Sequence, residues 1–431
     1  MIDKMIFAKL FGRFDYEIIF KPSGVTIITG PNGYGKSTIL RCIEALSEGD
    51  LYFFSRLDFE KIDIVLNEVE KNITISKSQD DLFINRTKLP IDVLYDKYKS
   101  ELRRYPYLLK VEHDKWLDRR TGEIIDIYEH NLKRSLIENS ERHGLIITDD
   151  ELPKKYANIV RQMKETIGNI YFIKEQRLIK EKRSRSEQEV INVIEDLPSK
   201  FKNRISDISS NYSAVANKLD SSYPNRLFDM ESGITEEEYG QKMIEMATKF
   251  EKLRKYDISE MQNSTNVVFK DEHAKALKIY FDDFNEKYKV YDDFIAKLDL
   301  FTDIINSRLS FKEIKISRES GIIVVDKDDE KRKLSLSQLS SGEKQEIVLF
   351  YELIFESAND VLLLIDEPEI SLHIVWQKMF MDDLLKIVNY RGIKVIVATH
   401  SPQIINNHWD KQIDLGALYG DQLGKSKFNK R

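Results

Sequence analysis

The stretch GPNGYGKST, from Gly30 to Thr38, constrains this 431-residue chain more than any other feature. It follows the apolar run from Val25 to Ile28, so we expect a buried strand, then a glycine-rich turn, then a helix. Gly30 and Gly35 let the backbone turn tightly enough for its N–H groups to surround a pyrophosphate. Lys36 can then reach the β and γ phosphates of a nucleotide. The sequence therefore predicts a phosphate-binding loop (P-loop).

Ser37 adds a place for a metal ion to this loop. Its hydroxyl would bind Mg²⁺, and the helix that starts there directs its positive dipole end at the anion. The alternative is a chance GxxxxGKS match, which the motifs described next argue against. The residues expected to line the nucleotide phosphates are Gly30, Pro31, Asn32, Gly33, Tyr34, Gly35, Lys36, Ser37 and Thr38.

A second motif places two carboxylates at the end of a strand. The apolar run from Val361 to Ile365 predicts a buried parallel strand, and Asp366 stands at its carboxyl end, where a Mg²⁺-binding carboxylate belongs. Glu367 follows, in position to polarise an attacking water while Asp366 holds the metal through a coordinated water. Glu369 is a weaker candidate for the base, because Pro368 fixes the turn and is expected to direct its side chain elsewhere.

A third motif, LSSGE from Leu339 to Glu343, precedes a helical pattern. It allows two interpretations. Ser340 can be an ordinary helix cap, or the N–H groups of Ser340, Ser341 and Gly342 can form a phosphate-binding helix start. The position just upstream of the strand that ends at Asp366 favours the second interpretation.

Together these motifs resemble those of ABC-type ATPase heads, the superfamily of transporter nucleotide-binding domains, SMC proteins, RecF and OLD-like ATPases. The resemblance implies an α/β head with a mixed sheet and helices on both faces, and ATP and Mg²⁺ as cofactors. In that superfamily the signature serine and glycine act in trans. The resemblance therefore implies a head-to-head dimer, in which Ser340 and Gly342 of one copy close over the γ-phosphate held by Lys36 of another.

Two further segments fit the same superfamily. The run from Val395 to His400 resembles the strand that ends in a switch histidine at the γ-phosphate, although His400 could equally be an ordinary strand-end histidine. The segment from Tyr171 to Gln176 resembles the glutamine loop that binds Mg²⁺, and Arg177 is the alternative for that role. The implied catalytic residues are Lys36, Glu367 and His400, and the implied metal ligands are Ser37, Gln176 and Asp366.

The loop that follows Asp366 and Glu367 indicates which group of ABC-type ATPases this chain resembles most. Transporter and SMC heads usually carry an aspartate where this chain has His373, and the histidine form with THSPQII from Thr399 to Ile405 is similar to OLD-like ATPases of bacterial conflict systems. The segments LFGRFDYEI, YFIKEQRL and SLHIVWQ resemble the ATPase subunits of PARIS-type and Septu-type anti-phage defence. Length and motif spacing favour PARIS. The resemblance covers roughly residues 1 to 90, 165 to 182 and 310 to 410.

Composition agrees with a cytoplasmic protein. With 32% charged residues and a mean hydropathy of -0.44, no run of about twenty apolar residues is available to cross a bilayer. No basic-then-apolar signal precedes Phe7. The single cysteine, Cys42, cannot form an internal disulfide and is expected to be a buried thiol. A net charge of -6 argues against wholesale nucleic-acid binding but allows a local basic surface.

The pattern of the chain predicts a head split by insertions. We expect a first lobe with the P-loop at 1–90, a helical accessory insertion at 91–165, the glutamine-loop segment at 166–182, a helical insertion at 183–310, and a second lobe at 311–431. In the first lobe we expect strands at 17–20, 25–28, 73–77 and 82–87 and one helix from Ser37. A β-hairpin is expected at 311–316 and 321–326, leading into the signature.

Two apolar seams mark the helical insertion. Thr235 and Glu238 form a capping box, after which apolar residues recur at spacings of four and three up to Leu253. A second seam runs from Leu277 to Leu298. Separated by residues 257–266, the seams favour an antiparallel helical hairpin shorter than an SMC arm, with a compact helical lobe as the alternative.

The sequence offers no second catalytic centre. Nothing after His400 resembles the acidic Toprim nuclease domain of OLD-family proteins, and the seven histidines and one cysteine do not have the spacing of an HNH or zinc site. We therefore expect a separate nuclease effector, with a phage-encoded trigger or nucleic acid as a further partner and no membrane. The competing hypothesis is a DNA clamp of the RecF or SMC kind. A basic cluster (Arg177, Lys180, Lys182, Arg183 and Arg185) could contact phosphates or an acidic partner, or could be a solvated loop.

Overall fold

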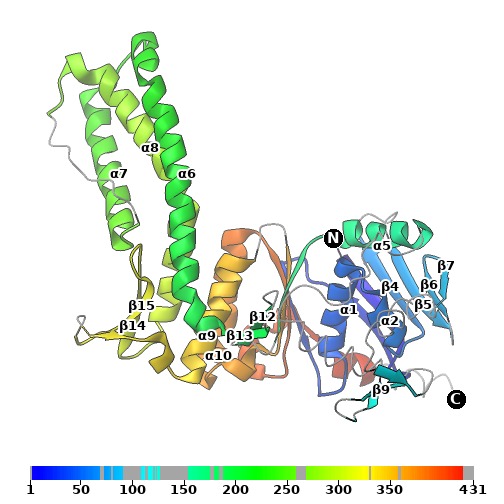
Figure 1. The fold of residues 1–431 in the computed structure, drawn as a ribbon. Coiled ribbons are helices and arrows are strands. Elements are labelled where there is room, and N and C mark those ends of the chain that lie inside the picture. The colour runs from blue at the N-terminus through cyan, green and yellow to red at the C-terminus, as the bar shows by residue number, and fades with distance from the viewer. Residues whose placement is uncertain are drawn as a thin grey trace. The chain divides into compact units, whose positions relative to one another are not determined.

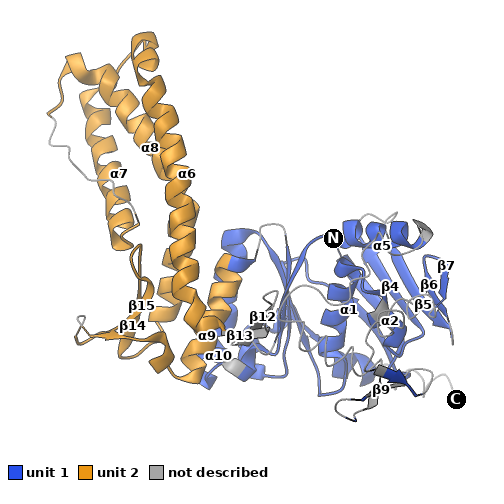
Figure 2. Cartoon of the chain, in the orientation of Figure 1, with its two compact units in different colours: residues 1–191, 356–431 blue, residues 192–355 orange. Residues whose placement is uncertain are grey.

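The computed structural model describes residues 2–67, 72–78, 81–90, 108–111, 115–119, 122, 124–126, 154–174, 179–183, 188–258, 268–329, 332–357 and 361–420. The chain forms two compact units (Figure 2). The first unit comprises Met1–Ile191 and Glu356–Arg431, and the second comprises Asn192–Phe355. The P-loop and both strand-end motifs belong to the first unit, and the signature motif belongs to the second.

A parallel sheet in the first unit carries the nucleotide motifs. Its strand order is β11-β17-β18-β3-β19, and every neighbouring pair is parallel. In the register, Asp366 lies opposite Ala398, and Ala398 lies opposite Ile28. The loops that follow these strands therefore leave the same edge of the sheet. The bounds are β11 Ile170–Ile173, β17 Leu362–Asp366, β18 Lys394–Ala398, β3 Val25–Thr29 and β19 Gln412–Asp414.

An antiparallel sheet, in the order β2-β1-β4-β5-β6-β7, completes the first lobe (Figure 1). Its strands alternate buried and more exposed residues, as expected for a sheet with one face on the core. Of the strands expected in this lobe, those at 17–20, 25–28 and 73–77 are confirmed. The run 82–87 is instead two strands separated by a turn at Asn85 and Arg86, whose φ values are +46° and +68°. The expected helix is confirmed and begins one residue early at Lys36, and a second short helix follows it at Leu51–Arg56. The bounds are β1 Ile2–Leu10, β2 Phe14–Ile19, β4 Lys61–Leu66, β5 Ile73–Ser78, β6 Asp81–Ile84 and β7 Thr87–Pro90.

Helices pack beside these sheets. The helix α1 after the P-loop buries an apolar face that includes Cys42, which is fully buried as predicted. A Cβ on Gly49, at the end of α1, would lie 2.4 Å from Val160 Cγ1 of α5, so the two helices approach closely there. The helices of this unit are α1 Lys36–Glu48, α2 Leu51–Arg56, α5 Lys154–Ile167, α10 Ile374–Arg391 and α11 Pro402–Ile405, with the 3₁₀ turns Pro368–Ser371 and Trp409–Lys411.

The expectation that residues 91–165 are helical is wrong for part of the described chain. Three short strands there form an antiparallel sheet in the order β10-β9-β8, and α5 is the one helix among the described residues of this range. Short apolar pairs lie before and after Gly122, which has a φ of +73°: Trp116 and Leu117 precede it, and Ile124 and Ile125 follow it. Short apolar runs of this kind favour strands. The many charged residues around them made the segment resemble a polar helical region. The strands are β8 Leu108–Lys110, β9 Lys115–Asp118 and β10 Ile124–Asp126, and a separate pair is β12 Ile179–Arg183 and β13 Gln188–Asn192.

Three helices dominate the second unit, namely α6 Val193–Asp229, α7 Glu236–Lys255 and α8 Ala274–Asn306. Helices α6 and α8 run antiparallel: Arg226 near the end of α6 pairs with Asp283 near the start of α8, and Phe201 packs against Phe301 at the opposite ends. Most of the second predicted seam is buried on α8, including Phe281, Tyr288 and Leu298. The long helical insertion is thus confirmed.

The direction of α7 corrects the predicted hairpin. Tyr239 lies against Phe281, Lys249 bonds Asn285, and Lys255 bonds Asp299, so positions on both helices advance together. Helices α7 and α8 therefore run parallel, and the antiparallel partner of α8 is α6. A seam reports which face of a helix is buried but not the direction of its neighbour. The residues between the two seams, 259–267, lie outside the described chain.

The remainder of the second unit carries the signature helix. The predicted β-hairpin is present as β14 and β15, and a Cβ on Gly321 at its turn would lie 2.1 Å from the Pro198 carbonyl oxygen of α6. Across the described residues, no helix has the length and apolarity needed to cross a membrane. The elements are β14 Lys312–Ser317, β15 Gly321–Asp326, β16 Lys333–Leu334, α9 Ser341–Tyr351, the π-helix Glu352–Glu356, and the 3₁₀ turns Asp271–His273 and Leu336–Gln338.

The α/β class, with parallel and antiparallel sheets and a long helical insertion, is confirmed. The finer division of the chain into five segments stays a prediction.

Candidate nucleotide site

The P-loop has the backbone that its glycines predicted. Gly30, Gly33 and Gly35 have φ values of +149°, +84° and +92°, a region in which side chains are strained. A Cβ on Gly35 would lie 3.1 Å from Leu10 Cδ2, so space as well as conformation selects glycine there. The next residue begins α1, which directs free helical N–H groups into the loop. Pro31, Asn32 and Gly33 are exposed, which leaves the rim of the loop open to a ligand.

Lys36 is held inside this loop. Only 5% of the residue is exposed, and its Nζ donates to the Gly30 carbonyl oxygen at 3.0 Å. The same Nζ lies 3.6 Å from Glu367 Oε1. A buried ammonium needs such partners. Its place at the centre of the glycine turn fits a triphosphate, whose anionic oxygens would supply stronger partners.

The fit for Mg²⁺ rests on Ser37 and Asp366. The Ser37 hydroxyl donates to Asp366 Oδ1 at 3.0 Å, although the two residues come from different strand–loop units of the sheet. A hydroxyl and a carboxylate are the hard oxygen donors that Mg²⁺ takes, and it commonly keeps waters between itself and protein carboxylates. These residues therefore fit the ion. The third predicted ligand, Gln176, and its alternative Arg177 lie outside the described residues.

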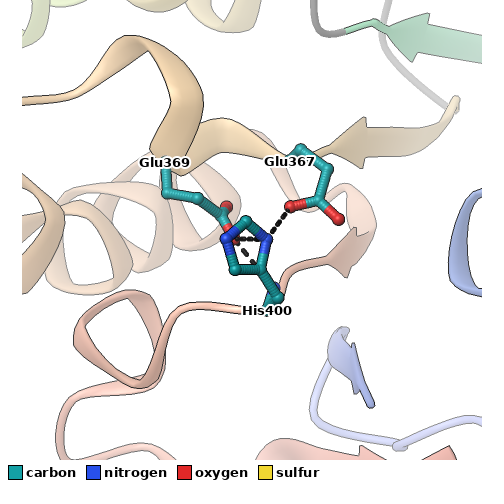
Figure 3. A group of neighbouring side chains, drawn as sticks. All are labelled: Glu367, Glu369 and His400. Carbon is teal, nitrogen blue, oxygen red and sulfur yellow. Dashed lines mark hydrogen bonds and ion pairs between the residues drawn. The ribbon is translucent and has the colours of Figure 1, made fainter. Parts of the chain in front are cut away.

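Glu367 occupies a strained backbone position at the end of β17. Its φ is +44°, a left-handed conformation that is uncommon for a residue other than glycine. Its N–H donates to the Ala398 carbonyl oxygen of the next strand at 2.9 Å. Its carboxylate meets His400 Nδ1 through Oε2 (Figure 3) and faces Lys36 through Oε1. Strain of this kind persists where the surroundings enforce it, and it is typical of functional sites.

The surroundings of Glu367 raise the pKa of its carboxyl above the ordinary glutamate value. Burial is the largest cause, and the negative charge of Glu369 adds to it. The bond to His400 acts in the opposite direction and lowers the pKa. A carboxylate with a raised pKa holds a proton more strongly, which suits a base that must accept hydrogen bonds from water.

The expectation that Pro368 directs Glu369 away from the site is wrong. Pro368 begins a 3₁₀ turn directly after the left-handed Glu367, and this turn brings the Glu369 side chain back towards His400. Figure 3 shows Glu367 and Glu369 on either side of the imidazole, and Glu369 Oε1 lies 3.1 Å from its Nδ1. One ligand atom from each of the three residues lies within 4.8 Å of the others, a set that could hold a metal ion.

Three polar residues around Glu367, Glu369 and His400 were not predicted from the sequence. Thr399 is fully buried and donates to Glu369, while Ser401 and Gln377 bond each other behind it. The available signal was the run Thr399–Ser401, whose hydroxyl and N–H donors directly follow a buried strand. His400 itself is the residue that the sequence singled out, and the structure places its ring at the acidic strand end.

The signature residues belong to the second unit. Ser340 caps α9: its hydroxyl accepts from the Glu343 N–H, and the Glu343 carboxylate accepts from the Ser340 N–H. The ordinary cap is therefore present. Ser340 and Ser341 are exposed, and Gly342 is half-buried. A phosphate-binding role for these three residues stays a prediction.

Comparisons with known proteins identify a family. A family model described as "AAA ATPase domain" matches residues 9–405. No curated protein matches the chain.

Among solved structures, the chain is similar to an SMC head domain with an extended coiled coil, bound to the C-terminal domain of ScpA, from Pyrococcus furiosus. That match has a TM-score of 0.37 and 15% identity, covering 94% of this chain and 91% of that chain. An SMC head from Thermotoga maritima gives a TM-score of 0.34 and 13% identity, covering 94% and 90%.

Proposed function

The chain belongs to the AAA ATPase domain family and is an ATP hydrolase, and from this premise we propose that it binds and hydrolyses MgATP at the edge of the parallel sheet. The observation that carries the proposal is the meeting of three loops. Lys36 and Ser37 follow β3, Asp366 and Glu367 end β17, and His400 follows β18. Side-chain contacts join Ser37 to Asp366, and they join Glu367 to both Lys36 and His400.

In the proposed reaction, the P-loop N–H groups and Lys36 bind the β and γ phosphates. Ser37, Asp366 and Gln176 would hold Mg²⁺, and the ion would neutralise charge on the phosphate oxygens. Glu367 accepts a hydrogen bond from the attacking water and orients it towards phosphorus. His400 contacts Glu367 and can donate to a phosphate oxygen. Lys36 would exchange part of its contact with Glu367 for the nucleotide, which frees the carboxylate to hold water.

A second copy would complete the site. The exposed Ser340 and Ser341 cap the start of α9, where helical N–H groups and the dipole favour an anion. The resemblance to ABC-type heads implies that these residues act on the nucleotide of a partner copy. We therefore propose a head-to-head dimer that sandwiches ATP between the P-loop of one subunit and the signature of the other, with a larger ring as a further possibility.

The biological role that we propose is in anti-phage defence. The resemblance of LFGRFDYEI, YFIKEQRL and SLHIVWQ to the ATPase subunits of PARIS-type and Septu-type systems supports a sensor or scaffold that holds a nuclease effector and releases it on recognition of a phage component. The work would take place in the cytoplasm. A neighbouring gene for a small nuclease-like protein, and co-purification of its product with this chain, would support that role.

Mass measurement by light scattering, with and without MgATP, tests the ATP-dependent dimer. Lys36→Ala should abolish ATP binding and leave the protein monomeric, while Glu367→Gln should retain ATP and accumulate as dimer. If the isolated protein instead binds duplex DNA tightly, with strong salt dependence and with hydrolysis stimulated by DNA ends, the clamp hypothesis replaces the effector hypothesis.

A further inference from the structure

We propose that Glu369 is a positioning residue for ATP hydrolysis: it anchors the loop after β18 and thereby keeps His400 against Glu367. The inference rests on the proposed function of this site. It assigns a role to a carboxylate that neither the P-loop nor the metal ligands require.

One carboxylate oxygen, Glu369 Oε1, accepts hydrogen bonds from three consecutive residues of the loop after β18. Glu369 Oε1 accepts from the Thr399 hydroxyl at 2.5 Å, from the His400 N–H at 2.8 Å and from the Ser401 N–H at 3.0 Å. The three donors are consecutive residues, and together they cover the turn that follows the strand. A loop whose successive donors all point to one fixed atom has little freedom to shift.

The anchor is itself fixed. Glu369 is 6% exposed, and Gln377 Nε2 of α10 donates to its backbone carbonyl oxygen at 3.3 Å and to that of Leu372 at 3.1 Å. The other end of the same amide, Gln377 Oε1, accepts from the Ser401 hydroxyl at 2.8 Å. Gln377 therefore braces the two loops against each other from behind. Glu369 and Gln377 make two independent links between the loop after β17 and the loop after β18.

The unshared oxygen of Glu369 argues against a purely structural ion pair. Oε2 is buried and has no hydrogen-bond partner within the described residues, and the one ion-pair contact of Glu369 there is with His400. A buried carboxylate kept only for stability would usually be paired with a lysine or arginine. This one instead binds the loop that carries His400, and it faces the imidazole that also meets Glu367.

Removing the anchor should affect turnover more than binding. The P-loop is built on β3 and α1, and Glu369 makes no hydrogen bond to it among the described residues. Loss of the anchor would release His400 from Glu367, and displacements of about 1 Å in a catalytic arrangement can cost about 10²-fold in rate. ATP affinity should be retained, because the groups that hold the phosphates do not move.

The experiment measures kcat and KM for ATP, and the binding stoichiometry of a fluorescent ATP analogue, in the full chain. We expect Glu369→Ala to lower kcat by about 10- to 100-fold with KM within about threefold of wild type. Glu369→Gln keeps an acceptor oxygen at the same place, so kcat should stay within about fivefold of wild type. Thr399→Val removes one of the three donors without changing the size of the side chain and should give a smaller loss.

Asp383→Asn is the matched control. Asp383 is an equally buried carboxylate of the same unit, 3% exposed, that accepts from Lys386 on α10 away from the site. Its substitution should leave kcat unchanged. The inference is overturned if Glu369→Ala turns over ATP like wild type, or if its loss of rate equals a loss of binding stoichiometry. It is also overturned if Glu369→Gln is as slow as Glu369→Ala, since charge rather than anchoring would then matter. A wild-type chain without ATPase activity would instead refute the proposed function.

Discussion

Glu369 in the first unit and Glu346 in the second are both buried carboxylates, but their partners differ. Glu346, 2% exposed, lies on α9 and pairs with the guanidinium of Arg308, which also covers the Phe350 ring at 4.6 Å. Glu369 accepts from a hydroxyl and two backbone N–H groups and leaves an oxygen unshared. The first arrangement neutralises charge and joins α9 to the end of α8. The second anchors the loop that carries His400.

A buried carboxylate can serve the stability of the fold or the chemistry of a site, and the two units contain one example of each. In the second unit, the charge of Glu346 is matched by Arg308, whose guanidinium lies over the Phe350 ring. In the first unit, strain at Glu367 and an unsatisfied oxygen at Glu369 coincide at one imidazole. Stability and chemistry should therefore respond to different substitutions in the two units.

The largest expected effect is on turnover in the first unit. Glu367→Gln removes the group that orients water, and kcat should fall by about 10²- to 10⁴-fold. ATP binding should persist, because Lys36 and the P-loop remain. Phosphate release at saturating ATP measures the rate. A wild-type rate in this variant would show that another residue orients the water.

The next effect is on stability in the second unit. Arg308→Met leaves the Glu346 charge buried without its partner and should lower the free energy of unfolding by about 3–5 kcal/mol. Adding Glu346→Leu should restore most of that loss. Urea unfolding measures both variants, and ATP affinity of the folded protein serves as the control. If the single substitution is neutral, this pair does not hold α9 in place.

A smaller effect is expected on the pH dependence of kcat, through the influence of Glu369 on the pKa of Glu367. Glu367 must be ionised to act as a base, so the rate should fall as the pH drops through its pKa, which burial and the Glu369 charge raise. Glu369→Gln removes that charge, which lowers the pKa and moves the acid limb of the kcat profile to lower pH, by up to about one unit. A limb that stays in place or moves to higher pH would show that the two carboxylates do not interact.

The smallest effect should come from an exposed ion pair of the second unit. Lys289 and Glu286 on α8 are largely exposed, and exposed pairs of this kind contribute less than about 0.5 kcal/mol. Lys289→Ala should therefore leave the urea midpoint almost unchanged. A loss comparable to that of Arg308→Met would remove the contrast between buried and exposed charge.

Local motifs allowed the sequence to predict most of the site. Gly30 and Gly35 were expected at special backbone angles, and Asp366 at a strand end, because these features depend on a few adjacent residues. Asp366 and His400 were both expected at the ends of strands, and parallel strands bring such ends to one edge of a sheet. Their side-chain partners, Ser37 and Glu367, were not predicted. The glutamine loop could be named from sequence, but Gln176 lies outside the described residues.

Features that depend on angles between segments were not predictable. Pro368 was expected to direct Glu369 away, since the left-handed conformation of Glu367, which redirects the following turn, leaves no mark in the residue types. The parallel course of α7 and α8 was missed because apolar spacing records a buried face and not a direction. Strands β8–β10 were missed because their apolar pairs are short and surrounded by charge.

A structure of Glu367→Gln with MgATP would test the central claim most directly. The account predicts that Lys36 contacts the γ-phosphate, that Mg²⁺ lies at Ser37 and Asp366, and that Ser340 and Gly342 of a second copy cover the same phosphate. A nucleotide bound elsewhere, or a saturated P-loop with no signature residues from another copy upon it, would contradict the account.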